Sequence, residues 1–393
     1  NIEQSAVAAD GAPKDVLLEY LSEESLADKL DDLLSGGGCA GVVVNTVRRA
    51  QVLAETLRER FGDDTVRLLH SRFLAPDRIG KEKELLNEIG NKDGGEKRLS
   101  KRIVVGTQVL EQSLDIDFDV LVTDICPMDL LLQRVGRLHR HERSRPAKLR
   151  FALCLIMGAD GEGFDEGAKA VYGEYLLMRT RALLPDRLKL PEDIPALVQG
   201  VYNEDADPSP EPAGYRKAKE EWRRLKDGKE KRAGDFRICP PWPGPEENIA
   251  GWLDTDVPDS DRRGEAAVRD SDESIEVLLI RENGGALCFL PWAEGGREIP
   301  QGEVLGDEMA KKLARQRLRL PDALCAPWNI EKTIKELEDL NRKRLAGWQV
   351  SPWLEGELFL ILDEKLSAKL CGYRLTYDEF FGLIYEKEEE ADE

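Results

Sequence analysis

The first 160 residues alternate between short apolar runs and longer stretches in which apolar residues recur at helical spacing. Five runs are predicted strands, at residues 40–47, 66–71, 102–107, 119–125 and 148–157. Amphipathic helices are predicted before and between them, at residues 22–38, 48–62 and 128–141. Short buried strands that alternate with helices predict an α/β fold with a doubly wound parallel sheet. Such a sheet binds ligands at the carboxyl ends of its strands.

The rest of the chain has a different pattern. Residues 161–245 combine helical periodicity with proline-rich turns and predict a helical linker. Residues 246–393 predict a small α+β C-terminal domain. Its expected elements are a hairpin at 273–292, a helix at 329–348 and further strands at 356–364 and 368–379. The first domain is therefore assigned residues 1–160.

Composition narrows the class of protein. The 393 residues, 41% apolar and 34% charged, predict a globular chain of two or three domains. No apolar run reaches the roughly 18 residues of a membrane span, and no secretory signal is visible. Seven cysteines without a Cys-x-x-Cys pair predict a reducing cytoplasm. Because the chain opens at Asn1 rather than Met, we expect a fragment or a processed product.

Charge is distributed unevenly along the chain, whose net charge is −20. Residues 41–150 hold 21 Lys and Arg against 17 Asp and Glu, a net of +4, while the remainder has a net of −24. This asymmetry allows a local phosphate site without a nonspecific polycation.

The stretch "QRVGRLHRH" concentrates cationic side chains. Read as a helix, it places Gln133, Arg137 and Arg140 on one face and apolar residues on another. Two guanidiniums and an amide on one face suit a polyphosphate whose charge grows during reaction. The alternative is a surface helix with solvated arginines.

Polar residues follow three of the predicted strands. Asn45-Thr46, Ser71-Arg72 (after His70) and Gly106-Thr107 each stand at a carboxyl end, where phosphates could be held. Asp115 lies one turn further on and could accept a ribose hydroxyl. Alternatively, Gly-Thr is an ordinary strand exit and Asp115 caps or ends a helix.

In order along the chain, "VVVNTV", "LLHSRF", "IVVGTQVLEQSLDI" and "QRVGRLHR" resemble motifs IV, IVa, V and VI of the second RecA-like domain of superfamily 2 helicases. Four ordered motifs are far more specific than any single one. "VNTVRRAQ", "QSLDIDFD" and "QRVGRLHRH" are similar, more narrowly, to the CRISPR-associated helicase–nuclease of type I interference systems. The similarity continues through "VYGEYLLMRTRALL", "GWLDTD" and "GYRLTYDEFFGLIYE", and its later part points to subtype E.

The resemblance implies roles for individual residues. Arg137 and Arg140 are expected to be arginine fingers that reach the γ-phosphate of ATP, with Gln133 beside them. Asp115 is expected at the ribose, and Arg134 at the nucleotide site, paired with an acidic residue across the cleft. Contacts to the backbone of single-stranded DNA are expected from Asn45, Thr46, Ser71, Arg72, Thr107 and Gln108. The C-terminal domain would close over the DNA channel and help to dock on the RNA-guided surveillance complex, Cascade.

Other parts of the family's chemistry are not visible. "SGGGCAG" lacks the lysine of a phosphate loop, and "LTYDEFF" fits a solvated turn better than a carboxylate pair for Mg²⁺. Three histidines cannot form the family's nuclease centre, and His139 and His141 would not share a helical face. No metal ligand is therefore assigned. We expect ATP and Mg²⁺ to be held mainly by a missing first RecA-like domain, and the nuclease metal only by a missing N-terminal nuclease domain.

Three interpretations remain open. The first is the C-terminal part of an ATP-dependent single-stranded DNA translocase and nuclease that degrades invader DNA, inactive without its N-terminal part. The second is a noncatalytic DNA-binding or docking module made as a separate polypeptide. The third is the distal half of an unrelated superfamily 2 helicase.

Overall fold

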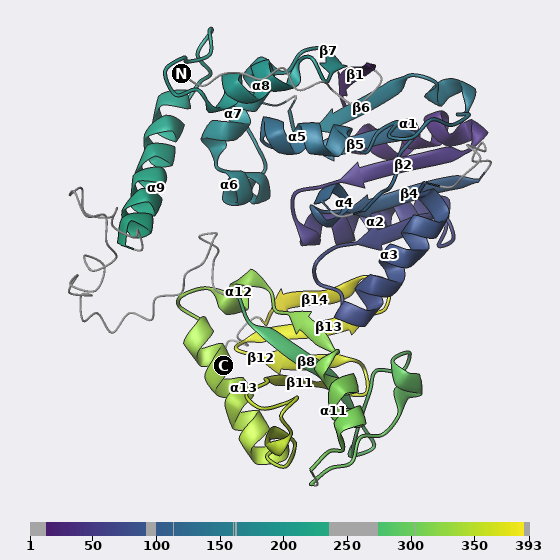
Figure 1. Cartoon of the computed structure of the whole chain (residues 1–393), viewed down its shortest axis with the longest axis vertical. Coiled ribbons are helices and arrows are strands. Elements are labelled where there is room, and N and C mark those ends of the chain that lie inside the picture. The colour runs from purple at the N-terminus through teal and green to yellow at the C-terminus, as the bar shows by residue number, and fades with distance from the viewer. Residues whose placement is uncertain are drawn as a thin grey trace, which may run out of the picture. The chain divides into compact units, whose positions relative to one another are not determined.

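The computed structural model of the chain (Figure 1) describes residues 13–91, 100–112, 114–159, 161, 163–235, 274–302 and 304–388. The chain divides into two compact units, Asn1–Pro212 with Glu273–Glu393, and Ala213–Asp272. The second unit contains α9 (Tyr215–Asp235), which confirms the charged helix predicted there. The segment "GWLDTD" lies outside the described residues.

A seven-stranded sheet organises the first part of the chain (Figure 1). Its strands are β1 (Lys14–Tyr20), β2 (Gly38–Val43), β3 (Val66–Leu69), β4 (Lys101–Gly106), β5 (Val120–Asp124), β6 (Ala152–Met157) and β7 (Arg187–Leu190). Their order is β3-β4-β2-β5-β6-β1-β7, and neighbours are parallel except for β1 and β7. The predicted strands and the predicted parallel α/β sheet, which is RecA-like, are confirmed.

Helices follow the strands of this sheet. They are α1 (Leu26–Leu33), α2 (Val47–Phe61), α3 (Ala75–Ile89), α4 (Val109–Gln112), α5 (Met128–Val135), α6 (Glu166–Tyr172), α7 (Glu174–Leu183) and α8 (Ile194–Tyr202). Short 3-10 helices occupy Glu23–Ser25, Leu34–Gly36, Ala147–Leu149, Glu294–Gly296 and Trp348–Val350.

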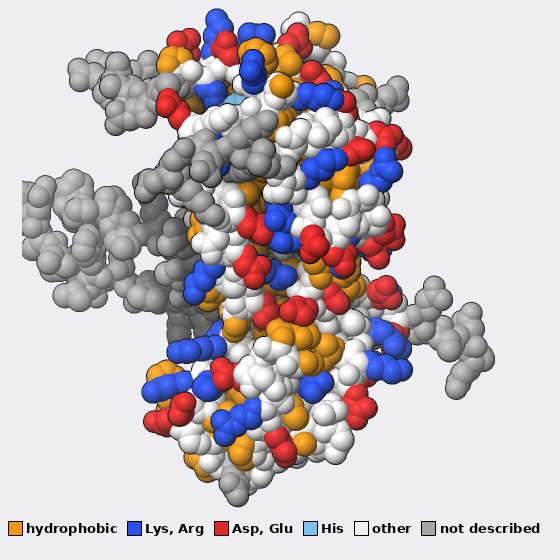
Figure 2. All heavy atoms as spheres, turned by 90° about the vertical axis from the view of Figure 1, so that its right-hand side faces the viewer, with side chains coloured by type: hydrophobic (Ala, Val, Ile, Leu, Met, Phe, Trp, Pro, Cys, Tyr) orange, Lys and Arg blue, Asp and Glu red, His pale blue; other side chains and the backbone are white. Residues whose placement is uncertain are grey.

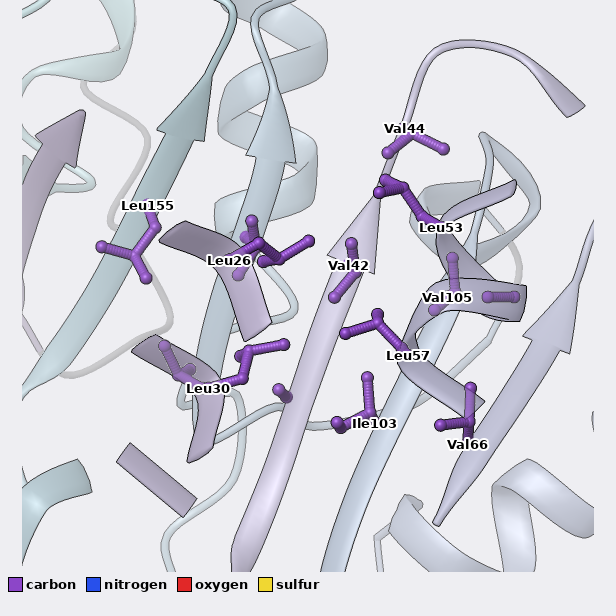
Figure 3. Packing of buried hydrophobic residues seen from close by; sticks show 14 of the residues in the cluster. Leu26, Leu30, Val42, Val44, Leu53, Leu57, Val66, Ile103, Val105 and Leu155 are labelled. Atoms are coloured by element: carbon purple, nitrogen blue, oxygen red, sulfur yellow. The ribbon is translucent and has the colours of Figure 1, made fainter. Parts of the chain in front are cut away.

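Helix α2 shows how the sequence sets the packing. The side chain of Thr46 caps its start by accepting from the backbone N–H of Arg49, and Gly62, with a φ of 86°, ends it. Leu53 and Leu57 project from its buried face toward Ile103 and valines of β2, β3 and β4 (Figure 3). The predicted apolar face of this helix is therefore confirmed.

Two strands of the seven-stranded sheet were not predicted. β1 lies before the first predicted helix, where no element was predicted, and β7 lies in the expected helical linker but pairs with β1. Within the region of predicted helical periodicity, α6 and α7 are separate helices because Gly173 adopts a φ of 76° between them. The polar pattern of "RLKL" and the single glycine gave no clear signal for either feature.

The C-terminal region contains two small sheets. Strands β8 (Glu276–Asn283), β9 (Ala286–Cys288), β10 (Arg317–Arg319) and β11 (Phe359–Leu362) form one, and β12 (Ser367–Leu370), β13 (Tyr373–Asp378) and β14 (Gly382–Lys387) form the other. The helices are α11 (Asp307–Ala314), α12 (Asp322–Cys325) and α13 (Ile330–Arg344). The hairpin of β8 and β9 and the helix α13 were predicted; α11, β10 and β14 were not.

The turn between β13 and β14 packs against the first sheet region, within the same unit. Phe380 and Phe381 contact its core, and the carbonyl of Phe381 accepts from Gln51 at 2.8 Å. His70 Nε2 lies 3.1 Å from the same carbonyl, and burial lowers the pKa of His70 to about 3. Gly382 has a φ of 68°, and a Cβ there would lie 2.6 Å from the carbonyl oxygen of Arg72. This turn is therefore a close-fitting contact that excludes larger residues.

Conversely, Leu74 of the first region belongs to the hydrophobic core of the C-terminal region. Its backbone N–H donates to the hydroxyl of Tyr377 at 2.9 Å, and that hydroxyl donates to Asp77 at 2.7 Å. Each region thus contributes side chains to the hydrophobic core of the other, so the contact between them continues both cores.

Charged side chains of both signs are interspersed over the face that Figure 2 shows. Opposite charges at short range largely offset one another at a distance beyond about 10 Å. Binding of an anion therefore depends on local geometry more than on the net charge of the chain.

Candidate nucleotide and nucleic-acid interfaces

The strand-end residues predicted to contact DNA lie at one edge of the sheet. Strands β3, β4 and β2 are neighbours in that order, so the residues that follow them are brought together. A cavity of about 890 Å³ lies at this edge. Five of the six predicted residues line it: Asn45, Thr46, Ser71, Arg72 and Gln108. We call this cavity the strand-edge groove.

The six residues differ in what they can offer. Ser71 is exposed, and Gln108 is partly exposed while its amide donates to the carbonyl of Asn45 at 3.3 Å. Asn45 is buried, and its amide already bonds to Ile125 O at 2.9 Å. Thr107 is buried as well and is absent from the groove lining. Asn45 and Thr107 therefore shape the edge, and Ser71 and Gln108 present atoms to a ligand.

The groove also has residues that the sequence analysis did not assign. Arg48 is exposed on α2, and Arg319 and Tyr385 come from the C-terminal region. The guanidinium of Arg72 lies 5.0 Å from the ring centroid of Tyr385 and 3.8 Å from the carboxylate of Asp322. Arg48 follows motif IV directly, which was a usable signal. Nothing in the sequence pattern relates Arg319 or Tyr385 to the groove, since that contact arises from tertiary packing.

The prediction that residues 128–141 form one helix is wrong. Helix α5 ends at Val135 with Gly136 as its C-cap. Leu138 is buried and forms an isolated parallel bridge with Phe118, whose N–H donates to Arg137 O at 2.8 Å. Burial of this leucine beside Phe118 outweighs continuation of the helix past a glycine. Gln133, Arg137 and Arg140 therefore do not share a helical face.

The loop after α5 brings Arg137 and Arg140 to separate partners. Arg137 donates to Glu111 O at 2.7 Å, whereas Arg140 Nε lies 2.7 Å from Asp115 Oδ1. His141 Nε2 lies 3.0 Å from the same oxygen. The hydrogen bond from Arg140 holds the pKa of Asp115 below its ordinary value. Asp115, expected at the ribose, therefore pairs with only one of the two arginines expected at the γ-phosphate, Arg140. Gln133 is exposed.

Arg134 is fully buried, which differs from its expected place at the nucleotide. Its acidic partner is Glu111, whose carboxylate lies 2.7 Å away. Glu111 belongs to the same domain, whereas the expected partner was an acidic residue across the cleft. It also donates to Thr123 Oγ1 at 2.9 Å and to Asn45 Oδ1 at 3.2 Å. A buried guanidinium with this many acceptors is a structural connector.

The same network reaches the strand-edge groove. The hydroxyl of Tyr172 in α6 lies 3.1 Å from Arg134 Nη2 and 3.0 Å from Gln108 Nε2, which donate to it. Burial raises the pKa of Tyr172 to about 12, so the hydroxyl keeps its proton. Continuous hydrogen bonds therefore connect α5 to a groove residue.

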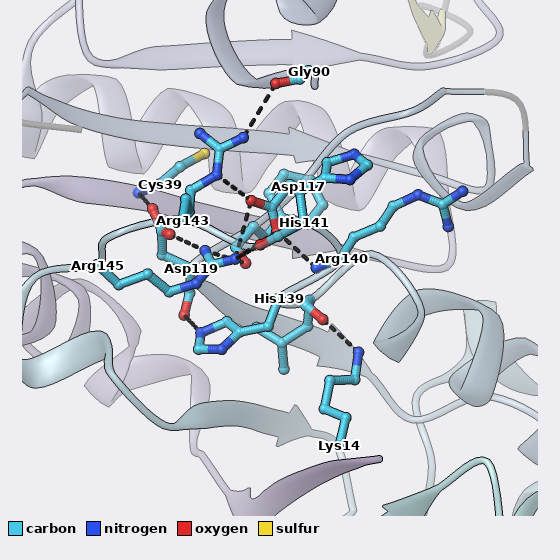
Figure 4. Close-up of polar contacts among 12 residues, drawn as sticks. Lys14, Cys39, Gly90, Asp117, Asp119, His139, Arg140, His141, Arg143 and Arg145 are labelled. Carbon is cyan, nitrogen blue, oxygen red and sulfur yellow. Dashed lines mark hydrogen bonds and ion pairs between the residues drawn. The ribbon is translucent and has the colours of Figure 1, made fainter. Parts of the chain in front are cut away.

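A second cluster of buried ion pairs packs against the loop that follows α5. Asp117 and Asp119 are buried, and Asp117 is 2.6 Å from Arg143 and 3.0 Å from Arg145 (Figure 4). Asp119 also pairs with Arg145 and accepts from the N–H of Cys39 at 2.7 Å. These arginine partners and backbone donors offset the cost of burying two carboxyl groups. The alternating aspartates of "DIDFD" and the pair "RSR" were a signal that the sequence analysis did not use.

In the described part of the chain, no cluster of three His, Cys, Asp or Glu residues is placed to hold a metal ion. None of the helices described has both the length and the apolar character of a bilayer-crossing helix. The six cysteines described are free thiols.

The parallel sheet with polar residues at its strand ends is a RecA-like domain, the class of domain from which superfamily 2 helicases are built. Residues 36–143 match the family model "CRISPR-associated nuclease/helicase Cas3, C-terminal". Residues 269–383 match the model "Cas3 C-terminal domain". The chain belongs to the Cas3 family and corresponds to its C-terminal region.

Individual relatives agree with this assignment. The CRISPR-associated nuclease/helicase Cas3 of Streptococcus thermophilus is 44% identical over 385 residues, which are 95% of this chain and 41% of the relative. The solved structure of T. fusca Cas3-ATP matches with a TM-score of 0.74 and 25% identity, over 96% of this chain and 43% of that one. A chain of a pre-nicking CRISPR RNA-guided surveillance complex matches with a TM-score of 0.70 and 25% identity, over 95% and 44%. This chain thus spans about two fifths of the length of these relatives, and subtype E stays a prediction.

Proposed function

We propose that this chain is the C-terminal part of an ATP-driven single-stranded DNA translocase and nuclease that degrades invader DNA in type I CRISPR interference. One observation carries the proposal. A groove at the strand ends and a loop with two arginines occupy one RecA-like domain, joined through the buried network of Arg134. Coupling of DNA movement to ATP hydrolysis requires both sites and a connection between them.

Arg137 and Arg140 are proposed to act on the γ-phosphate. Guanidiniums placed at the transferred phosphoryl group stabilise the charge that develops there. Arg140 must first leave Asp115, and this exchange is inexpensive because exposed ion pairs contribute roughly 0–1 kcal/mol. The freed Asp115 is proposed to accept the ribose hydroxyl, and Gln133 is exposed on α5.

The ATP and Mg²⁺ are proposed to be held mainly by a first RecA-like domain, and the nuclease metal by a nuclease domain, both N-terminal to this region. The described residues do not fit a Mg²⁺ centre, since they hold no suitable cluster of ligands. This chain alone is accordingly proposed to be inactive.

Single-stranded DNA is proposed to lie in the strand-edge groove. Ser71, Gln108, Arg48 and Arg72 supply hydroxyl, amide and guanidinium donors for its phosphates. The C-terminal region contributes Arg319 and Tyr385 to the lining of the groove and is proposed to help dock on the surveillance complex. Cytoplasmic location stays a prediction from the cysteine usage.

The central experiment mixes this chain with the N-terminal nuclease and first RecA-like domains. We expect single-stranded DNA to stimulate ATP hydrolysis only in the assembled enzyme. Arg137→Ala should lower that rate by at least about 10³-fold. Arg150→Ala, an exposed arginine beside the same loop, is the matched control and should retain it. Hydrolysis of ATP by this chain alone would contradict the proposal.

The groove is tested separately by DNA affinity. Arg48→Ala should weaken binding of single-stranded DNA and reduce the salt dependence of log Kd by about one unit. Arg60→Ala removes an exposed arginine from the other end of α2 and should leave both quantities unchanged. Fluorescence anisotropy at several salt concentrations measures both. Equal losses in the two variants would place the DNA elsewhere.

A further inference from the structure

Lys14 lies in β1, outside the four helicase motifs, yet its side chain ends at the loop after α5 (Figure 4). Its Nζ donates to the carbonyl oxygen of Val135 at 3.2 Å and to that of Leu138 at 2.5 Å. Val135 is the last residue of α5, and Leu138 follows the turn made by Gly136 and Arg137. One ammonium group therefore joins the two ends of the turn that presents Arg137.

The position of Lys14 is fixed by the pairing of β1 in the sheet, and not by any of the four helicase motifs. Val16, two residues on, pairs with Ala152 of β6, and Leu17 with Leu153, so β1 has a fixed register. The last carbonyls of a helix lack partners within the helix, and a cation at this end is favoured by the helix dipole. Lys14 places a cation at this end of α5 and gives Val135 O a second hydrogen bond, beside the one from the backbone N–H of Leu138 at 3.0 Å.

The surroundings make this lysine costly to keep charged. The charged or titratable groups that face it are Asp117, Arg145, Arg140, Cys154 and His139. Burial, and then the two arginines, outweigh the favourable Asp117 and lower the pKa of Lys14 to about 8. Burial also lowers the pKa of His139 to about 4, which leaves that ring neutral. Partly buried lysines with lowered pKa values are concentrated at functional sites.

We propose that Lys14 is a positioning residue for the arginine fingers, fixing the backbone turn between Val135 and Leu138 so that Arg137 and Arg140 reach the γ-phosphate. The inference rests on the proposed function, because the fingers act only in an ATPase. Lys14 does not touch the nucleotide. It acts through two carbonyl oxygens, and misplacement of a finger by about 1 Å is enough to lower the rate.

The contact can be tested on this chain alone. The side-chain NMR signals of Lys14, assigned by their loss in Lys14→Arg, should titrate with a midpoint near pH 8. A midpoint near the ordinary 10.5 would overturn the contact. This measurement needs no ATPase, so its outcome is independent of the proposed function.

The role is tested in the assembled enzyme. Lys14→Met should lower the kcat of DNA-stimulated ATP hydrolysis on the order of tenfold, with KM for ATP within about twofold, and Lys14→Arg should restore most of the rate. The wild-type kcat should also fall as pH rises through about 8, where Lys14 loses its proton, and this fall should be absent in Lys14→Arg. The exposed Lys148→Met is the control and should keep both the rate and the alkaline fall.

A structural role alone gives a different pattern. Lys14 lines a cavity of about 1040 Å³, so water can replace its ammonium group at the two carbonyls. Lys14→Met should therefore keep the unfolding midpoint of the wild type. A lowered midpoint with equal loss of kcat in Lys14→Met and Lys14→Arg, or a wild-type kcat in Lys14→Met, would overturn the positioning role. An assembled wild-type enzyme that hydrolyses no ATP would instead overturn the proposed function while leaving the NMR result standing.

Discussion

The two ends of motif VI differ in how firmly their arginines are held. Arg134, in α5, has no exposed surface and bonds to Glu111, Thr123 and Asn45. Arg140, six residues on, lies in the loop and pairs at the surface with Asp115. The buried arginine has its partners fixed by folding, whereas the exposed one can exchange its partner for a ligand. The same residue type thus serves the fold at one end and is available for chemistry at the other.

The largest effect on stability is expected at Arg134, the buried arginine of the pair. Arg134→Met leaves the carboxylate of Glu111 buried without its partner, which should lower the free energy of unfolding by about 3–5 kcal/mol. The double variant Arg134→Met with Glu111→Leu removes both charges and should recover part of that loss. Urea unfolding measures all three chains. A loss below 1 kcal/mol in Arg134→Met would show that the pair is not the structural connector.

Arg140 should behave in the opposite way. Arg140→Ala should leave the free energy of unfolding within about 0.5 kcal/mol of the wild type, as for exposed sites in general. In the assembled enzyme it should lower DNA-stimulated ATP hydrolysis by about 10³-fold, a loss typical of an arginine finger. Steady-state ATPase and urea unfolding, measured on the same variant, separate the two effects. Retained ATPase would remove Arg140 from the proposed mechanism.

His70 is a buried titratable side chain, and its burial should make the stability of the fold depend on pH. Burial lowers its folded pKa to about 3 from an unfolded value of 6.5, so only the unfolded chain gains a proton between these values. Stability should therefore fall as pH drops below 6.5, by about 2 kcal/mol at pH 5. Urea unfolding between pH 7 and 5 measures the slope. His70→Gln removes the titrating group, and an unchanged slope in that variant would assign the effect to other residues.

The smallest effect is expected at Asp115. Asp115→Asn removes an exposed partner of Arg140 and should change the free energy of unfolding by less than about 1 kcal/mol at pH 7. Because Arg140 lowers the pKa of Asp115, the pair contributes above pH 3.8 and is lost as pH falls through the lower folded value. The difference between variant and wild type should therefore vanish at low pH. A difference that persists there would come from something other than the ion pair.

The sequence predicted the parallel sheet well because buried strands such as Ala152–Met157 are continuous apolar runs. It did not predict β7, since Arg187–Leu190 alternates charged and apolar residues at an antiparallel edge. The end of α5 was missed for a related reason. Residues 128–141 keep helical periodicity, and only the distant Phe118 draws Leu138 out of the helix.

The candidate site was predicted in part. Motif spacing brought Ser71 and Gln108 to one groove, as the strand order requires. A motif does not show which of its residues are buried. Arg134 and Asn45 were therefore expected to contact ligands, although both are buried and hydrogen-bonded to other residues of the fold. Lys14 carries no motif, because its place depends on the register of β1 beside β6.

The contact of Phe381 with His70 has a consequence for biosynthesis. These two residues are 311 positions apart, so the pocket around His70 stays unfilled while the intervening chain is made. At about 5–20 residues per second, the ribosome needs roughly 15–60 s to supply Phe381. During that interval the nascent sheet exposes apolar surface that the finished protein covers, which makes it a candidate for chaperone protection.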